Sequence, residues 1–274
     1  MANPPDPPPV VSTKKTAMLC YWLCALLLAV AIALEIAAFF FPLRFSAWFD
    51  PIFVFAATAS TLVSLWRRLP MQNVLLAALG VAVIGGGFSA LGARTGLPFG
   101  QFLFASHIGP ILFKTLPAML PLVWIVIILS SRGVARLILR PWRKTRAYGF
   151  RVIGLTAFLV LLFVFTFDPF ASRVRHYWLW LPTTLPLTWQ GTSLINFVSW
   201  GFIAILILLL ITPVLIVKKP RSKSAPDFQP LCLWLGAVLV FGTGCALNHL
   251  WGAVIADAVI GIGTAVFAIR GALW

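Results

Sequence analysis

The sequence contains eight apolar runs that are long enough, or nearly long enough, to cross a lipid bilayer. The hydrocarbon core of a bilayer is about 30 Å thick, which an α-helix of about 20 residues spans. The second run is short and the last two are joined by a very short connection, so the sequence is also compatible with six or seven spans. The runs lie at about 17–41, 51–66, 72–93, 111–130, 150–168, 193–217, 230–249 and 252–270.

The composition excludes an ordinary soluble domain. Hydrophobic residues make up 61% of the 274 residues, charged residues only 10%, and the mean hydropathy is +1.00. Such a chain cannot keep a polar surface in water. We therefore predict an all-α fold, a polytopic membrane helical bundle of about eight transmembrane helices. Residues 16–274 are expected to form a single integral-membrane domain, and residues 1–15 a Pro-rich disordered cytoplasmic tail.

The distribution of positive charge tests this topology. Short cytoplasmic loops are enriched in Lys and Arg, and an eight-span chain with both termini cytoplasmic puts 16 of the 21 cations inside and 5 outside. The net charge of +15 is thus explained by membrane orientation and by anionic lipid headgroups. No basic patch is interleaved with a nucleic-acid-binding motif, so nucleic acid is not an expected partner.

The same topology gathers the titratable residues at the outer leaflet. Four of the six acids and all three histidines fall in the outer half of a helix or in an outer loop: Glu35, Asp50, Asp168, Asp257, His107, His176 and His249. Either these groups lie near the interface because a polar group there costs little free energy, or they form one polar pocket that opens outward. Glu35 and Asp257 are expected a turn or more inside the hydrocarbon, where an unpaired carboxylate is costly.

Two outer connections carry unusual sequences. The segment 95–104, "TGLPFGQFLF", is too rich in Gly and Pro for a continuous helix, and we expect a re-entrant or interfacial segment that caps a pocket. The segment 167–200 holds Asp168 at a helix exit, followed by cations, tryptophans and prolines, and its flat rings suit a long apolar ligand. The fourth run carries Pro110, Pro117 and Pro121 and is expected to be a helix kinked more than once.

Metal and cofactor signatures are missing from the sequence. The pair Cys20 and Cys24 has no nearby His or carboxylate to complete a ligand set. All four cysteines lie in apolar runs, and we interpret them as packing residues: Cys20, Cys24, Cys232 and Cys245. Glycine-rich nucleotide-binding and paired-His motifs do not occur either. We expect no metal and no cofactor.

The stretch 91–124 resembles a family of membrane proteins of carotenoid biosynthesis, which includes the bacterial carotenoid 1,2-hydratases. A "TGLPFG" core is followed by an aromatic pair two apart, a "GP" and prolines leading to "PLVW", and further on come the "DP" at 168–169 and the "NFVSW" at 196–200. The resemblance covers about residues 70–205. Together with the outer segments it suggests ten substrate-binding residues: Thr95, Phe99, Phe102, Phe104, His107, Trp124, Trp178, Trp180, Asn196 and Trp200.

The chain departs from this family pattern at the position of an acid. Ser89 stands where the family usually has an acidic residue, Gly86 where a histidine is expected, and Phe102 and Phe104 where tyrosines are common. Hydration of an isolated alkene needs a strong proton donor, a role that Ser89 cannot fill. We predict Asp168 as the catalytic acid, assisted by one of two further carboxylates, Glu35 or Asp257.

Two functions follow from these observations. The first is a hydratase that adds water to a terminal C=C of an acyclic carotenoid end group, acting without a cofactor. The second is a non-catalytic carotenoid or lipid carrier, or a small transporter. Expected partners are the lipid bilayer, a carotenoid and other enzymes of the carotenoid pathway. The resemblance implies the bacterial cytoplasmic (inner) membrane, and the charge distribution predicts that the active-site side faces the periplasm.

Overall fold

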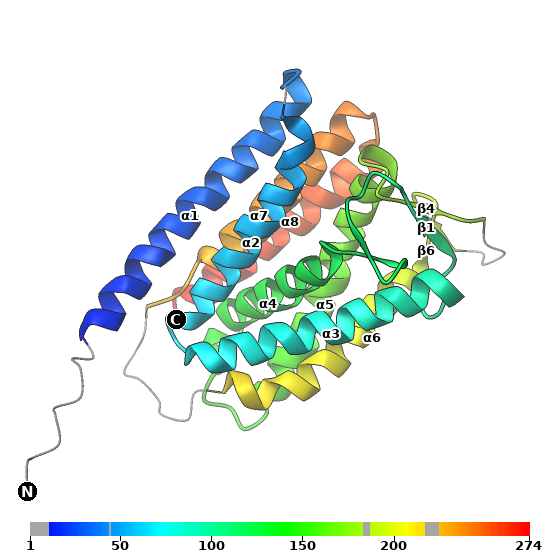
Figure 1. Ribbon diagram of the computed structural model, residues 1–274. Coiled ribbons are helices and arrows are strands. Elements are labelled where there is room, and N and C mark those ends of the chain that lie inside the picture. Colours follow the sequence, from blue (N-terminus) through cyan, green and yellow to red (C-terminus); the bar gives the residue numbers. More distant parts are fainter. Residues whose placement is uncertain (1–10, 44, 183–186, 217–224) are drawn as a thin grey trace, which may run out of the picture.

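Eight long helices form one bundle in the computed structural model, which describes residues 11–43, 45–182, 187–216 and 225–274 (Figure 1). All eight are long and apolar enough to span a membrane, so the predicted all-α polytopic bundle is confirmed, with eight spans among these residues. The helices are α1 Val11–Phe40, α2 Phe49–Trp66, α3 Met71–Thr95, α4 Leu120–Ile138, α5 Tyr148–Pro169, α6 Leu194–Ile211, α7 Gln229–Leu247 and α8 Trp251–Ala272.

The predicted N-terminal tail lies largely outside the described residues. Its first ten residues are not described, and α1 already begins at Val11. Because the chain crosses the bundle eight times, α1 begins and α8 ends at the same end (Figure 1).

Helix α4 occupies the centre of the bundle. It packs against α2, α3, α5, α7 and α8. In its most apolar stretch 67% of the residues are buried, compared with 17% for α1 and 22% for α8. The outer helices leave large apolar side chains such as Leu26, Val259 and Phe267 exposed. Such a surface suits contact with lipid chains.

The fourth run is not the kinked helix that its prolines predicted. Residues Ile111–Leu112 (β2) and Leu116–Pro117 (β3) form a short antiparallel pair, and α4 begins only at Leu120, with Pro121 in its first turn. Proline restricts the preceding residue to extended backbone, whereas its missing N–H is harmless at a helix start. The helix continues to Ile138 and includes Arg132 and Arg136, which lie toward the basic end of the bundle.

Helix α5 does not stop at Asp168, as the Asp-Pro pair suggested. It continues through Pro169 into one turn of π-helix, Phe170–Val174. The Ser172 hydroxyl donates to the Asp168 carbonyl at 2.7 Å. Proline is tolerated within a spanning helix where such side chains satisfy the freed backbone groups. Asp168 therefore lies inside the helix, with 1% of its surface exposed.

The connections that follow α3 and α5 join to form a small sheet at one end of the bundle (Figure 1). β1, Phe102–Phe104, follows α3 and pairs antiparallel with β4, Trp178–Trp180, which follows α5. A third pair, β5 (Thr188–Trp189) with β6 (Thr192–Ser193), precedes α6. Gly96, in the left-handed region with φ +77°, ends α3 and turns the chain toward β1. As predicted, the segment 95–104 does not form a continuous helix. Its strand β1 and the strand β4 together form a cover over this end of the bundle.

Candidate functional site

An aromatic cavity with one buried carboxyl lies beneath this cover. Its empty volume is about 390 Å³. Helices α3, α4, α5 and α6 and the strands β1 and β4 all contribute to its walls. The lining residues are Ser89, Phe99, Phe102, Phe104, Leu120, Val164, Phe167, Asp168, Trp178, Trp180, Asn196 and Trp200.

The β1–β4 pair supplies four of the aromatic rings. Successive side chains of a strand point to opposite faces, so Phe102 and Phe104 share one face with their cross-strand partners Trp180 and Trp178. The ring centroids of Phe102 and Trp180 are 5.3 Å apart. The residues between them, at 103 and 179, are each 56% exposed on the other face. The alternation therefore directs one aromatic face into the cavity.

The Asp168 carboxyl accepts hydrogen bonds from three side chains. Trp178 Nε1 donates at 3.1 Å, Trp180 Nε1 donates at 3.3 and 3.2 Å to the two oxygens, and the Thr192 hydroxyl donates to Oδ2. An indole nitrogen can only donate, whereas a hydroxyl can also accept. When Asp168 is protonated, Thr192 is the partner that accepts its O–H. The cradle thus accommodates both forms of the carboxyl.

Ser89, where the resemblance predicted an acid, lies in the same cavity. Its hydroxyl accepts a hydrogen bond of 2.9 Å from Trp124 Nε1, and the Trp124 ring stacks on Trp200 at 3.7 Å between centroids. A Cβ added at Gly86, where the resemblance predicted a histidine, would lie 3.3 Å from Leu116 and 3.4 Å from Pro121. Apolar side chains therefore border this position.

One unpaired donor also lines the cavity. The Asn196 amide nitrogen is buried, with no hydrogen-bond partner among the described residues. The interior leaves about 30 Å³ for the centres of water molecules. One water needs roughly 10–15 Å³ by this measure. The cavity has room for water beside a donor that can orient it.

Seven of the ten predicted substrate-binding residues line the cavity, and Trp124 lies directly behind it. The other two have local roles. The Thr95 hydroxyl donates to the Leu91 carbonyl at 2.8 Å and accepts from the Leu97 amide at 3.1 Å, at the end of α3. His107 is exposed, with Nε2 3.2 Å from the Arg175 carbonyl.

The other two predicted catalytic acids do not line the cavity. Glu35 pairs with Arg175, which also contacts Asp50 at 3.2 Å. Burial disfavours the charge of Arg175, but the two carboxylates and Tyr177 outweigh it and raise its pKa. Burial and Asp50 raise the pKa of Tyr177 well above its usual value. These groups tie α1 and α2 to the chain that follows α5.

Asp257 lies on α8, where a Cβ at Gly242 of α7 would be 3.4 Å from Oδ2. Both of its carboxyl oxygens are buried without a hydrogen-bond partner among the described residues. No group of three or more His, Cys, Asp or Glu among those residues is placed to hold a metal ion.

Sequence reasoning missed several residues of the site. Thr192 is 24 residues from Asp168, and a lone threonine in a loop carries no signal for this contact. Leu120, Val164 and Phe167 have the appearance of ordinary apolar helix positions. Only their place in the bundle brings them to the cavity.

The fold and the site together define a class: a polytopic helical membrane protein with an aromatic, acid-bearing cavity under a cover at one end. The family model described as carotenoid biosynthesis protein matches residues 49–266. The chain belongs to this family, and its role lies in carotenoid biosynthesis. The match spans α2 to α8 and includes Asp168 and Asp257, while Glu35 on α1 lies before it. No curated protein and no solved structure matches the chain significantly.

Proposed function

We propose that the protein is a hydratase that adds water to a terminal C=C of an acyclic carotenoid end group. The observation that carries this proposal is the position of Asp168: a carboxyl 1% exposed, in the wall of a cavity with seven aromatic rings. An apolar end group fits such a lining, and the carboxyl is the acid that the reaction needs.

The reaction begins with proton transfer. Asp168 gives its carboxylic proton to the less substituted alkene carbon, and the π electrons form the new C–H bond. The adjacent carbon becomes a tertiary carbocation. A water molecule, oriented by the Asn196 amide, attacks this carbon through its oxygen and loses a proton to the Asp168 carboxylate. The sum is one water added, and the acid is restored.

The aromatic lining stabilises the carbocation that forms between proton transfer and the attack of water. A cation is attracted to the face of an aromatic ring, most strongly that of tryptophan, within about 6 Å of its centroid. Trp178, Trp180 and Trp200 belong to the lining and are buried or partly buried. Their rings stabilise a carbocation without offering it a nucleophile. The Asp168 carboxylate, left by proton transfer, adds an opposite charge.

The test is the pigment mass in a host that produces an acyclic carotenoid. Wild-type protein is expected to add one water per reacting end group. Asp168→Asn keeps the shape of the side chain but has no acidic proton, so we expect the hydrated pigment to fall at least 100-fold. Asp257→Asn is the matched control, a buried carboxyl outside the cavity, and should keep most of the product.

Two results would contradict this assignment. If Asp168→Asn left the hydrated pigment unchanged, Asp168 would not be the acid. If Asp257→Asn or Glu35→Gln abolished the product while folded protein persisted in the membrane, a second carboxylate would take part, as the sequence first suggested.

A carotenoid carrier is the second candidate, favoured by the three donors on Asp168. Hydrogen bonds to a carboxylate favour its ionised form, which cannot give a proton. In that case the cavity would hold an end group without changing it. Purified protein would then carry a carotenoid of unaltered mass, and Asp168→Asn would change the amount bound but not the mass.

The proposal also places the protein in the bacterial cytoplasmic membrane, with the cavity facing the periplasm. The excess of cations at the other end supports this orientation. A carotenoid would reach the cavity from the lipid, and other enzymes of the pathway are the expected neighbours.

A further inference from the structure

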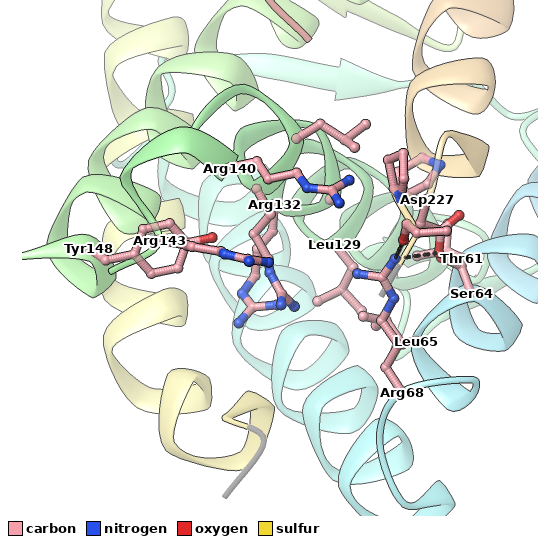
Figure 2. A pocket seen from close by; sticks show the side chains of 16 residues that line it. Thr61, Ser64, Leu65, Arg68, Leu129, Arg132, Arg140, Arg143, Tyr148 and Asp227 are labelled. Atoms are coloured by element: carbon pink, nitrogen blue, oxygen red, sulfur yellow. Dashed lines mark hydrogen bonds and ion pairs between the residues drawn. The ribbon is translucent and has the colours of Figure 1, made fainter. Parts of the chain in front are cut away.

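A second hollow lies at the opposite end of the bundle, and arginines dominate its walls (Figure 2). It lies between α2, α4, the turn after α4 and the start of α7, with a volume of about 170 Å³. An adjoining hollow of about 810 Å³ shares several of the same residues. We call the first hollow the arginine pocket. Its arginines are Arg68, Arg132, Arg136, Arg140 and Arg143.

Arg132 is the most buried of these arginines, with 7% of its surface exposed. The hydrogen bond recorded for its guanidinium goes to the Leu215 carbonyl at a long 3.5 Å. No carboxylate of the described residues lies within 4.0 Å of it. A buried charge without a counter-charge is costly, so a charge of opposite sign is expected to enter this pocket.

The chain itself supplies little negative charge here. Of its six acids, four lie toward the other end and Asp6 is outside the described residues. The remaining acid, Asp227, already accepts from Tyr21 at 3.0 Å and from Ser64 at 2.9 Å, and lies 3.9 and 3.8 Å from Arg67 and Arg68. Burial lowers the pKa of Arg68, although Asp227 opposes this. The segment 217–224, which precedes Ala225 in the chain, is outside the described residues, and its sequence contains cations and no acid.

We propose that the arginine pocket binds a phosphate group, carried by an anionic phospholipid or free in solution. The planar guanidinium fork matches the oxygens of phosphate and binds them in pairs. Arg132, Arg136 and Arg143 all line this pocket, and a phosphate group offers them more acceptor oxygens than a single carboxylate does. Tyr148 adds a hydroxyl to the same wall (Figure 2). Basic pockets between spanning helices at a cytoplasmic face suit anionic headgroups.

The test measures binding to the full chain from both sources. The lipid arm uses nanodiscs of phosphatidylcholine with and without phosphatidylglycerol, and native mass spectrometry counts the lipid retained on the protein. The second arm titrates inorganic phosphate in detergent, with chloride at equal ionic strength, and follows the unfolding temperature. The pocket variant is Arg136→Gln with Arg143→Gln. The matched control is Arg146→Gln with Arg151→Gln, which removes the same charge from exposed residues that line neither hollow.

We expect the pocket variant to bind at least tenfold more weakly than wild type, and the control to bind within twofold of it. An unfolding temperature that rises with phosphate but not with chloride identifies free phosphate as a second source, and lipid retention without such a rise identifies the headgroup alone. Equal weakening by both variants, or no binding in either arm, would overturn the proposal. If the double variant does not fold, Arg143→Gln alone, at an exposed position of a turn, is compared with Arg146→Gln.

Discussion

At the scale of single residues, the site depends on how one carboxyl is held. Asp168 accepts from Trp178, Trp180 and Thr192, and each donor comes from a segment that follows α5. The two indoles bind any acceptor, but Thr192 alone can reverse its hydrogen bond when the acid carries its proton. Thr192 is therefore the partner that can hydrogen-bond to Asp168 both as a carboxylate and as a carboxylic acid.

Replacing Thr192 with valine removes this hydroxyl at nearly constant volume. In the hydratase that we propose, the protonated acid then lacks its acceptor, and we expect the hydrated pigment to fall at least tenfold. Thr192→Ser restores the hydroxyl and should restore most of the product. The readout is pigment mass at equal levels of membrane protein. Equal loss in both variants would point to packing instead of hydrogen bonding.

Ser89 has a structural role that its loss should reveal. Ser89→Ala leaves the buried Trp124 N–H without its acceptor, and an unsatisfied buried donor costs about 1–3 kcal/mol. Ser130→Ala is the control, since the Ser130 hydroxyl on α4 is buried without a partner among the described residues. Unfolding in detergent should show a clear loss of stability for Ser89→Ala and little change for Ser130→Ala. The reverse order would contradict the hydrogen bond.

At the scale of elements, the pairing of β1 with β4 assembles the cavity. The Leu181 amide donates to the Gln101 carbonyl at 3.0 Å and the Ala105 amide to the Tyr177 carbonyl at 2.9 Å, so the ladder extends beyond the strands at both ends. Leu103 and Leu179 lie opposite each other in this register. Hydrogen-bonded pairs alternate along an antiparallel ladder, which makes them the bonded pair at its centre.

Leu103→Pro removes the backbone donor at the centre of this ladder. We expect β1 to separate from β4, the rings of Phe102 and Phe104 to leave the cavity, and carotenoid binding to weaken at least tenfold. Leu103→Ala keeps the N–H and removes only an exposed side chain, so its binding should match wild type. Pigment retained on purified protein is the measurement. Similar retention by all three proteins would show that the pairing is dispensable.

At the scale of the whole molecule, the bundle separates charge along its length. The acids Glu35, Asp50 and Asp168 lie toward the end with the strands, and the arginine pocket lies at the other. Positive charge next to spanning helices favours the cytoplasmic side. The cavity and the arginine pocket therefore lie at opposite ends of the bundle, and we propose that the arginine pocket is at the cytoplasmic end.

This orientation predicts the result of cysteine labelling in whole cells. In a variant without the native cysteines, Ser106→Cys lies in the outer connection beside β1, and Thr145→Cys lies in the basic turn after α4. A membrane-impermeant maleimide should label Ser106→Cys in intact cells, and Thr145→Cys only after permeabilisation. The opposite pattern would invert the orientation that we propose.

The sequence alone determined the approximate place of the spans, because a bilayer demands about 20 apolar residues whatever the neighbours. It left six to eight spans open, and the structure has eight among the described residues. The sequence also indicated the aromatic segments and Asp168, since Gly- and Pro-rich aromatic segments and a carboxyl group are uncommon in a chain that spans lipid. It missed the start of α4 by nine residues, because the effect of Pro117 and Pro121 depends on the position that each occupies.

Only the tertiary structure decided which polar groups meet. The sequence predicted that Glu35 or Asp257 would assist Asp168, yet Asp168 alone of these acids lines the cavity. Glu35 and Asp50 share Arg175, and Asp257 on α8 packs against α7. Side-chain contacts are short-ranged, so partners separated by tens of residues leave no local pattern. The pairing of β1 with β4 and the burial of Arg132 belong to the same category, because each depends on how distant segments pack.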